Sequence, residues 1–182
     1  HVDILPENIH TFPGDLPKEN VFAFCEDYEK AIAAVGGIDI QVLGIGQLGN
    51  IAMNEPGTQP NSSTRLVIMD GNSRMDVKSL FGNVAQVPNC AITLGIDTIL
   101  QAQEVILLAF GQHKAGIVKQ AIEEVASATC PASYLQRHKN AAFVIDLDAA
   151  NKLTRINHPW KVTNCEWTDQ LVRRAVVWLC EQ

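Results

Sequence analysis

A glycine-rich stretch followed by a carboxylate is the part of this sequence best suited to chemistry. Gly44, Gly46 and Gly49 come after an apolar run with the spacing G-x-G-x-x-G, and Asn54 and Glu55 follow closely. Glycines in such a turn let backbone N–H groups approach a ligand, and this spacing occurs in loops that hold a dinucleotide. Glu55 could act as an acid or base, or orient one. The stretch therefore suggests a dinucleotide loop, another small-molecule site, or a turn with a purely architectural role.

The residues after the third glycine argue against a dinucleotide. That fingerprint needs its third glycine in the first turns of a long helix. Here Pro56 interrupts any helix soon after Gly49, and residues 54–63 have the composition of a loop. Asp70 stands near the spacing of a ribose-binding acid, but its context "MDGNS" is typical of a strand end followed by a helix N-cap. We therefore interpret the stretch as a strand, a glycine turn and a loop.

The elements that must position this stretch are short apolar runs that alternate with helical patterns. Strands are expected at 38–43, 64–69, 90–94, 104–110 and 141–147. Several of them are apolar on both faces, as parallel strands buried beneath helices are. The alternation predicts an α/β three-layer sandwich with a mainly parallel, Rossmann-like sheet. Ligands bind at the carboxyl ends of strands in such folds, and the segments directly after three of the strands are 44–57, 95–98 and 111–114.

Three helical patterns lie beside these strands. They cover 19–35, 113–128 and the residues from Asp169 onward. The first pattern stops at Gly36 and Gly37, which is typical of a helix C-terminus. The second places five apolar side chains on one stripe that should face the core: Ile117, Val118, Ala121, Ile122 and Val125.

The composition excludes several classes of function. The 182 residues are 47% hydrophobic and 19% charged, as expected for a globular protein. The formal net charge is -6 and the chain has no extended basic cluster, which argues against nucleic acid as a partner. No apolar run approaches the roughly 20 residues of a membrane span, so a membrane partner is not expected either.

The five cysteines are odd in number, widely spaced and free of any C-x-x-C pair. This pattern favours free thiols in a reducing compartment over a zinc site or a disulfide framework. We therefore predict a cytoplasmic protein with no metal site.

Several segments in order resemble one known family. "GIDIQVLGIGQLGNIAMNEPG" resembles the glucosamine-6-phosphate deaminase (isomerase) signature, a strand followed by G-I-G-x-D-G-H-I-x-F-N-E-P-G. "NSSTRLVIMDGNSR", "VPNCAITLGIDTILQAQEVILLAFGQHKAGIVKQAIE" and "PASYLQRHKNAAFVIDLDAANKL" resemble its later motifs. The likeness runs from about residue 7 to residue 155. The resemblance implies a sheet of the sugar-phosphate isomerase/deaminase type.

The resemblance also implies an activity, the conversion of glucosamine 6-phosphate to fructose 6-phosphate and ammonia without a cofactor. In that family a loop histidine opens the sugar ring, supported by an aspartate two residues earlier and by the glutamate of N-E-P. An aspartate of an upstream M-D-E-Y motif moves the proton between C2 and C1. A serine- and glycine-rich loop, an arginine and a lysine hold the phosphate.

The catalytic positions of the family fall on three residues here. Glu55 matches the glutamate, but Asn50 stands at the histidine position and Leu48 at the aspartate position. Imidazole can exchange a proton near neutral pH, whereas an amide only forms hydrogen bonds. Loss of general acid–base catalysis costs about 10²–10⁴-fold in rate. The resemblance thus implies either an enzyme with weakened ring opening or a sugar-phosphate-binding module without catalysis.

The phosphate-binding positions are partly retained. Lys114 matches the phosphate lysine, at a helix start where the dipole also favours an anion. The arginine position falls on Ser79, with Lys78 beside it as a substitute. The remaining expected substrate-binding residues are the glycines of the turn: Gly44, Gly46 and Gly49.

A rebuilt ring-opening site would need another titratable group near Asn50. His113 and His138 are the candidates, because both lie close in sequence to loops that should line the pocket. A helix-start role for His113 and an exposed turn role for His138 are the simpler alternatives.

The likeness predicts two parts in the chain. Residues 1–155 form a deaminase-like domain whose N-terminal part is missing, and 156–182 form an extension that ends within a helix. This extension resembles the tail of long bacterial versions with a fused deacetylase-like domain. Its tryptophans are expected to pack rather than to stack on a ligand. The expected partners are a phosphorylated amino sugar and further copies of the chain.

Overall fold

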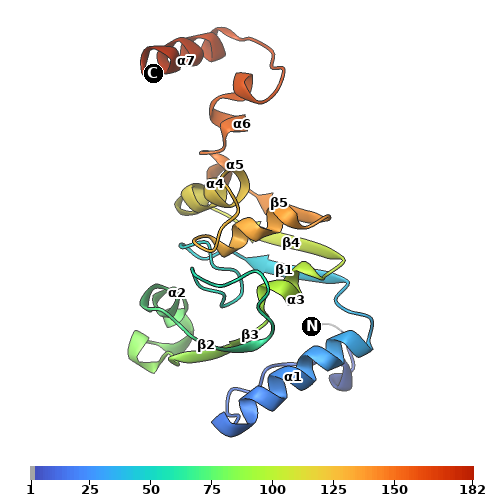
Figure 1. Ribbon diagram of the computed structural model, residues 1–182. Helices are drawn as coiled ribbons and strands as arrows, with labels where there is room; N and C mark the ends of the chain where they lie inside the picture. The colour runs from blue at the N-terminus through green and yellow to red at the C-terminus, as the bar shows by residue number, and fades with distance from the viewer. Residues whose placement is uncertain (1–2) are drawn as a thin grey trace.

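The computed structural model describes residues 3–182 and has a three-stranded parallel sheet at its centre (Figure 1). The strands are β1 (Ile40–Gly44), β4 (Glu104–Ala109) and β5 (Ala141–Ile145), in the order β1-β4-β5. Val42 lies beside Ile106, which lies beside Ala142. Each of these strands forms where the apolar runs predict it.

The two remaining strands make a separate antiparallel pair. β2 (Arg65–Ile68) and β3 (Cys90–Thr93) lie beside each other below the main sheet in Figure 1. The predicted α/β class with a mainly parallel sheet is confirmed. The pairing of β2 with β3 was not foreseen, because short apolar runs do not reveal which neighbour they pair with. As a result, the segment after β3 does not share the sheet edge that lies beyond β1 and β4.

The helices connect and cover these strands. They are α1 (Lys18–Ala34), α2 (Gly71–Phe81), α3 (Ile96–Leu100), α4 (Ala115–Glu123), α5 (Leu147–Ala150), α6 (Thr154–Asn157) and α7 (Asp169–Cys180). Short 3-10 helices form at η1 (Pro6–Asn8), η2 (Val84–Gln86), η3 (Gln112–Lys114), η4 (Pro131–Arg137) and η5 (Pro159–Lys161).

The ends of α1 and α4 can be compared with the ends predicted from the sequence. α1 stops at Ala34, and Gly37 donates its N–H back to the Ile32 carbonyl at 2.9 Å with φ +98°, as the glycine pair predicts. α4 ends earlier than the pattern indicates. Val125, predicted on the buried stripe, lies beyond the helix and is 89% exposed, so that prediction was wrong.

The core lies on one face of the parallel sheet. Leu43, Val105 and Leu107 point to this face and pack against α3, α4, α5 and η4. Ile96, Val118 and other side chains of these helices are fully buried there. Burial of such side chains stabilises the fold by roughly 1.5–3 kcal/mol each.

The opposite face of the sheet is apolar but exposed. It carries Ile40 and Val42 at 57% and 56% exposure, with Leu108 and Val144 in the neighbouring strands at 37% and 46%. Parallel sheets are ordinarily covered on both faces. Within residues 3–182 the helices cover one face only.

The C-terminal segment extends away from the sheet beyond α5 (Figure 1). Trp160 stacks on Trp167 with 6.0 Å between ring centroids and meets Trp178 edge-on at 6.3 Å. The three tryptophans thus contact one another, although Trp167 remains 55% exposed. Arg174 of α7 donates to the carbonyls at the end of α6. In the described part of the chain, no helix is both long and apolar enough to cross a bilayer.

Candidate functional site

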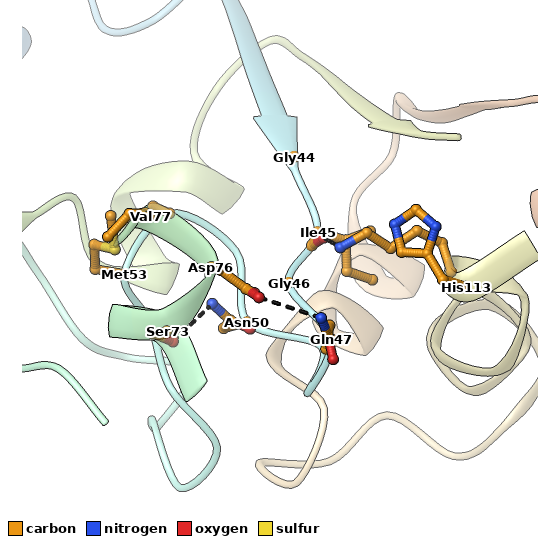
Figure 2. A pocket seen from close by; sticks show the side chains of 12 residues that line it. Gly44, Ile45, Gly46, Gln47, Asn50, Met53, Ser73, Asp76, Val77 and His113 are labelled. Atoms are coloured by element: carbon orange, nitrogen blue, oxygen red, sulfur yellow. Dashed lines mark hydrogen bonds between the residues drawn. The ribbon is translucent and has the colours of Figure 1, made fainter. Parts of the chain in front are cut away.

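A cavity of about 470 Å³ opens at the carboxyl ends of β1 and β4 (Figure 2). These strands are neighbours and run parallel, so the turns that follow them meet at one edge of the sheet. The lining side chains come from three segments, 44–53, 73–77 and 113–114. The cavity thus joins the glycine turn to the starts of α2 and α4.

The glycine turn is shaped by its own hydrogen bonds. Gly46 donates its N–H to the Asn50 carbonyl at 2.9 Å, and Gly49 donates to the Gly46 carbonyl at 3.1 Å. Gly49 has φ +80°, which favours glycine. A Cβ at Gly46 would overlap the Asn50 amide. Gly46 and Gly49 therefore serve internal packing, and Gly46 lines the cavity together with Gly44.

The Asn50 side chain forms one wall of the cavity. It is 9% exposed, and its Nδ2 donates to Ser73 Oγ at 3.4 Å. Ser73 is fixed in turn, because its N–H donates at 2.9 Å to the Asp70 carboxylate, the N-cap of α2. The capping interpretation of Asp70 is confirmed, and that carboxylate is committed to the helix.

The opposite wall carries positive charge. Lys114 lies at the start of α4 and donates from Nζ to the Ile45 carbonyl at 2.8 Å, which holds its ammonium beside the turn. His113, the preceding residue, is exposed and lines the same cavity. The N-terminus of α4 adds a favourable dipole for an anion.

Asp146 holds this wall in place. Its carboxylate accepts the Gly111 N–H at 3.0 Å and the Ala149 N–H at 2.8 Å. These backbone hydrogen bonds, from Ala149 first and then Gly111, hold the pKa of Asp146 below its ordinary value. Gly111 has φ +86° and begins the turn that carries His113. The bond to Ala149 is a local N-cap of α5, whereas the bond to Gly111 joins segments 35 residues apart and could not be predicted from the sequence.

Asp76 and Gln47 also line the cavity, and neither was predicted from the sequence. Gln47 Nε2 donates to Asp76 Oδ1 at 3.2 Å across the cavity (Figure 2). Asp76 follows Ser73 at the helical spacing i, i+3, so both side chains share a face of α2. That spacing was the available signal.

The sequence of the chain is similar to that of known proteins. Residues 1–144 match the family of glucosamine-6-phosphate isomerases/6-phosphogluconolactonase. The chain belongs to this family. It is 51% identical, over its whole length, to a glucosamine-6-phosphate deaminase-like protein of Bacteroides thetaiotaomicron, and it spans 27% of that protein. It is 46% identical to a glucosamine-6-phosphate deaminase of Shewanella woodyi, over 85% of this chain and 58% of that protein.

Solved structures lead to the same fold. A monomeric glucosamine-6-phosphate deaminase superposes with a TM-score of 0.73 at 37% identity, over 76% of this chain and 57% of that one. A 6-phosphogluconolactonase from Trypanosoma cruzi, 23% identical, has a TM-score of 0.58 over 78% of this chain and 55% of that one. The second likeness shows the shared fold alone.

Not every family position lies at the cavity. Among the described residues, Leu48, Gly49, Glu55 and Lys78 are not part of its lining. Leu48 is 37% exposed and Lys78 is exposed on α2. Both oxygens of the Glu55 carboxylate are buried and have no hydrogen-bond partner within residues 3–182. The family glutamate is thus present but enclosed in the protein.

The N-E-P loop is held from its asparagine. Asn54 is fully buried and donates from Nδ2 to the carbonyls of Ile51 at 3.1 Å and Leu94 at 2.8 Å. The Met53 N–H donates to Thr93 Oγ1 at 3.1 Å. These bonds tie the loop to the end of β3, so Asn54 has a positioning role.

His138 does not reach the cavity. Its Nε2 lies 2.7 Å from the Ala102 carbonyl, and its Nδ1 accepts the Asn140 N–H at 3.0 Å. Both ring nitrogens are thus engaged by backbone groups. His138 therefore joins β5 to the end of α3. Of the two candidate histidines, the structure brings only His113 to the cavity.

Proposed function

We propose that the cavity binds a phosphorylated amino sugar, as part of a glucosamine-6-phosphate deaminase-like protein with weakened ring opening. The observation that carries this proposal is the buried Asn50 amide, which lines the cavity at the signature's histidine position. Lys114 faces the same cavity and supplies a cation for a phosphate. Membership of the family supports the substrate class.

The chemistry follows from the groups available. Lys114 and the N-terminus of α4 would hold the phosphate dianion. The Asn50 amide would donate or accept a hydrogen bond at the sugar ring, but it cannot take up a proton near neutral pH. Ring opening would therefore proceed about 10²–10⁴-fold more slowly than with an imidazole at this position.

A second candidate, a sugar-phosphate-binding module without catalysis, is favoured by the state of Glu55. Its carboxylate is enclosed and does not line the cavity. An acid that does not reach the ligand cannot transfer a proton to it. In this candidate the protein keeps the binding half of the site and lacks the proton-transfer half.

Calorimetry and an ammonia assay on the chain, extended to the length of its curated relatives, test both candidates. We expect glucosamine 6-phosphate to bind and little or no ammonia to be released. Leu48→Asp combined with Asn50→His should raise ammonia release if weakened ring opening is the cause, and leave it unchanged in a binding module. Rapid turnover by the unaltered chain would contradict the proposed loss of ring opening. Absence of sugar-phosphate binding would contradict both candidates.

A further inference from the structure

We infer that Asp76 recognises the ammonium group of an amino sugar phosphate, at the wall of the cavity opposite the phosphate. This inference rests on the proposed function, and it adds a specificity-determining residue to the site. It concerns which end of the ligand lies where, and why an amino sugar would be preferred over a sugar with a hydroxyl at the same carbon.

The first step is the position of Asp76. Ser73, Asp76 and Val77 share one face of α2 and all three line the cavity. Figure 2 shows the Asp76 carboxylate directed toward the glycine turn, where Gln47 Nε2 donates to its Oδ1 at 3.2 Å. A carboxylate has about four acceptor sites. The bond from Gln47 occupies one of them, so the group can accept further hydrogen bonds from a ligand.

The second step is the separation of charge within the cavity. Asp76 lies on the α2 side of the glycine turn, and His113 lies on the other side in Figure 2. Lys114 is the next residue after His113, and its Nζ is bonded to the Ile45 carbonyl. One wall is thus negative and the other positive.

The third step is the match to a ligand. A phosphate near Asp76 would be repelled by a like charge, whereas a phosphate near Lys114 would be attracted. Neither cation of α2 lines the cavity, because Lys78 is exposed elsewhere on the helix and Arg74 donates to the carbonyls of Val84 and Val87. The phosphate therefore belongs at the α4 wall and the ammonium at the α2 wall. A ligand with both charges satisfies the two walls at once.

The exposure of the Asp76 side chain limits how strongly it can favour an amino sugar phosphate. The Asp76 side chain is exposed at the mouth of the cavity, so water screens its attraction for an ammonium. Exposed ion pairs of this kind change an equilibrium by about two- to fivefold. We therefore expect a preference of about this size for glucosamine 6-phosphate over glucose 6-phosphate.

The test compares both sugar phosphates by calorimetry on the full chain. Asp76→Asn keeps an oxygen for Gln47 but removes the charge. It should lower the affinity for glucosamine 6-phosphate about two- to fivefold and leave the affinity for glucose 6-phosphate unchanged. Asp27→Asn makes the same charge change on an exposed part of α1 and should alter neither affinity. Thermal unfolding of each variant, followed by circular dichroism, checks that it is folded.

The outcomes separate the two proposals. If Asp76→Asn lowers the affinity for both sugar phosphates equally, or changes neither affinity, the role of Asp76 is overturned and the proposed function still stands. Failure of the unaltered chain to bind either sugar overturns the proposed function and this inference with it. Selective loss of the amino sugar's advantage supports both.

Discussion

The Asn50 side chain occupies a space that its neighbours define closely. Its amide contacts Ser73 on one side and fills the room left by the missing Cβ of Gly46 on the other. An imidazole is larger than this amide, so Asn50→His must displace part of that packing. Asn50 is therefore coupled to the turn that carries it, and a substitution at Gly46 will alter the packing of Asn50 and the reverse.

Gly46→Ala tests this coupling. The added methyl group would overlap the Asn50 amide, so we expect a loss of about 1–3 kcal/mol in the free energy of unfolding and weaker binding of glucosamine 6-phosphate. Urea unfolding and calorimetry measure the two effects. Gly71→Ala is the control, because its Cβ would meet no atom of the described residues within 4 Å. An equal effect of the two substitutions would show that the Asn50 contact is unimportant.

At the scale of elements, one carboxylate links α1 by hydrogen bonds to two distant segments of the fold. Glu29 Oε1 accepts the Thr64 N–H at 2.7 Å and the Thr98 hydroxyl at 2.6 Å. Burial alone would raise the pKa of Glu29, but the hydrogen bonds from Thr64 and Thr98 outweigh it and leave the pKa below its ordinary value. The ionised form thus joins α1 to the start of β2 and to α3.

Glu29→Gln should therefore destabilise the protein in a pH-dependent way. Hydrogen bonds to a charged group contribute about 1.5–3 kcal/mol, so we expect a loss of about this size at pH 7. Because the folded pKa is depressed, the contribution is present above the unfolded pKa of about 4.3 and is lost as pH falls through the folded pKa. Urea unfolding at pH 7 and near pH 3 measures this difference.

Glu26→Gln, one turn away on the exposed surface of α1, is the matched control and should change stability little. If Glu29→Gln lowers the free energy of unfolding equally at both pH values, the role of the ionised carboxylate is contradicted.

The elements also show how far the sequence leads. The five strands and α1 could be predicted, because apolar runs and the glycine stop are local signals. The antiparallel pairing of β2 with β3 and the early end of α4 could not, since both depend on contacts between distant segments. At the site, Asn50 and Lys114 were found through the family signature. Asp76 was not, because its spacing from Ser73 places it on a face of α2 but does not reveal that this face meets Gln47.

At the scale of the whole molecule, the two faces of the parallel sheet differ in cover. Leu107 and Leu108 are adjacent in β4 and point to opposite faces, with exposures of 0% and 37%. Only Leu107 belongs to the core cluster. Substitutions at these two leucines therefore measure the contribution of each face of the sheet to stability.

Leu107→Ala should cost about 2–5 kcal/mol in the free energy of unfolding, because it leaves a cavity in packed surroundings. Leu108→Ala should cost clearly less, since its side chain already contacts solvent. Urea unfolding of the two variants measures the difference. Comparable losses would mean that the outer face is covered in solution, for instance by a second copy of the chain, and light scattering would then reveal the assembly.

The order of the central strands has a consequence for how the protein folds. β4 must find β1 across the long stretch from residue 44 to residue 104, and it is this pairing that brings the cavity's two turns together. Pairings between distant segments close slowly, whereas β4 and β5 are separated by a shorter connection. We therefore expect the binding cavity to be among the last features to form during refolding, after β4 and β5 have paired.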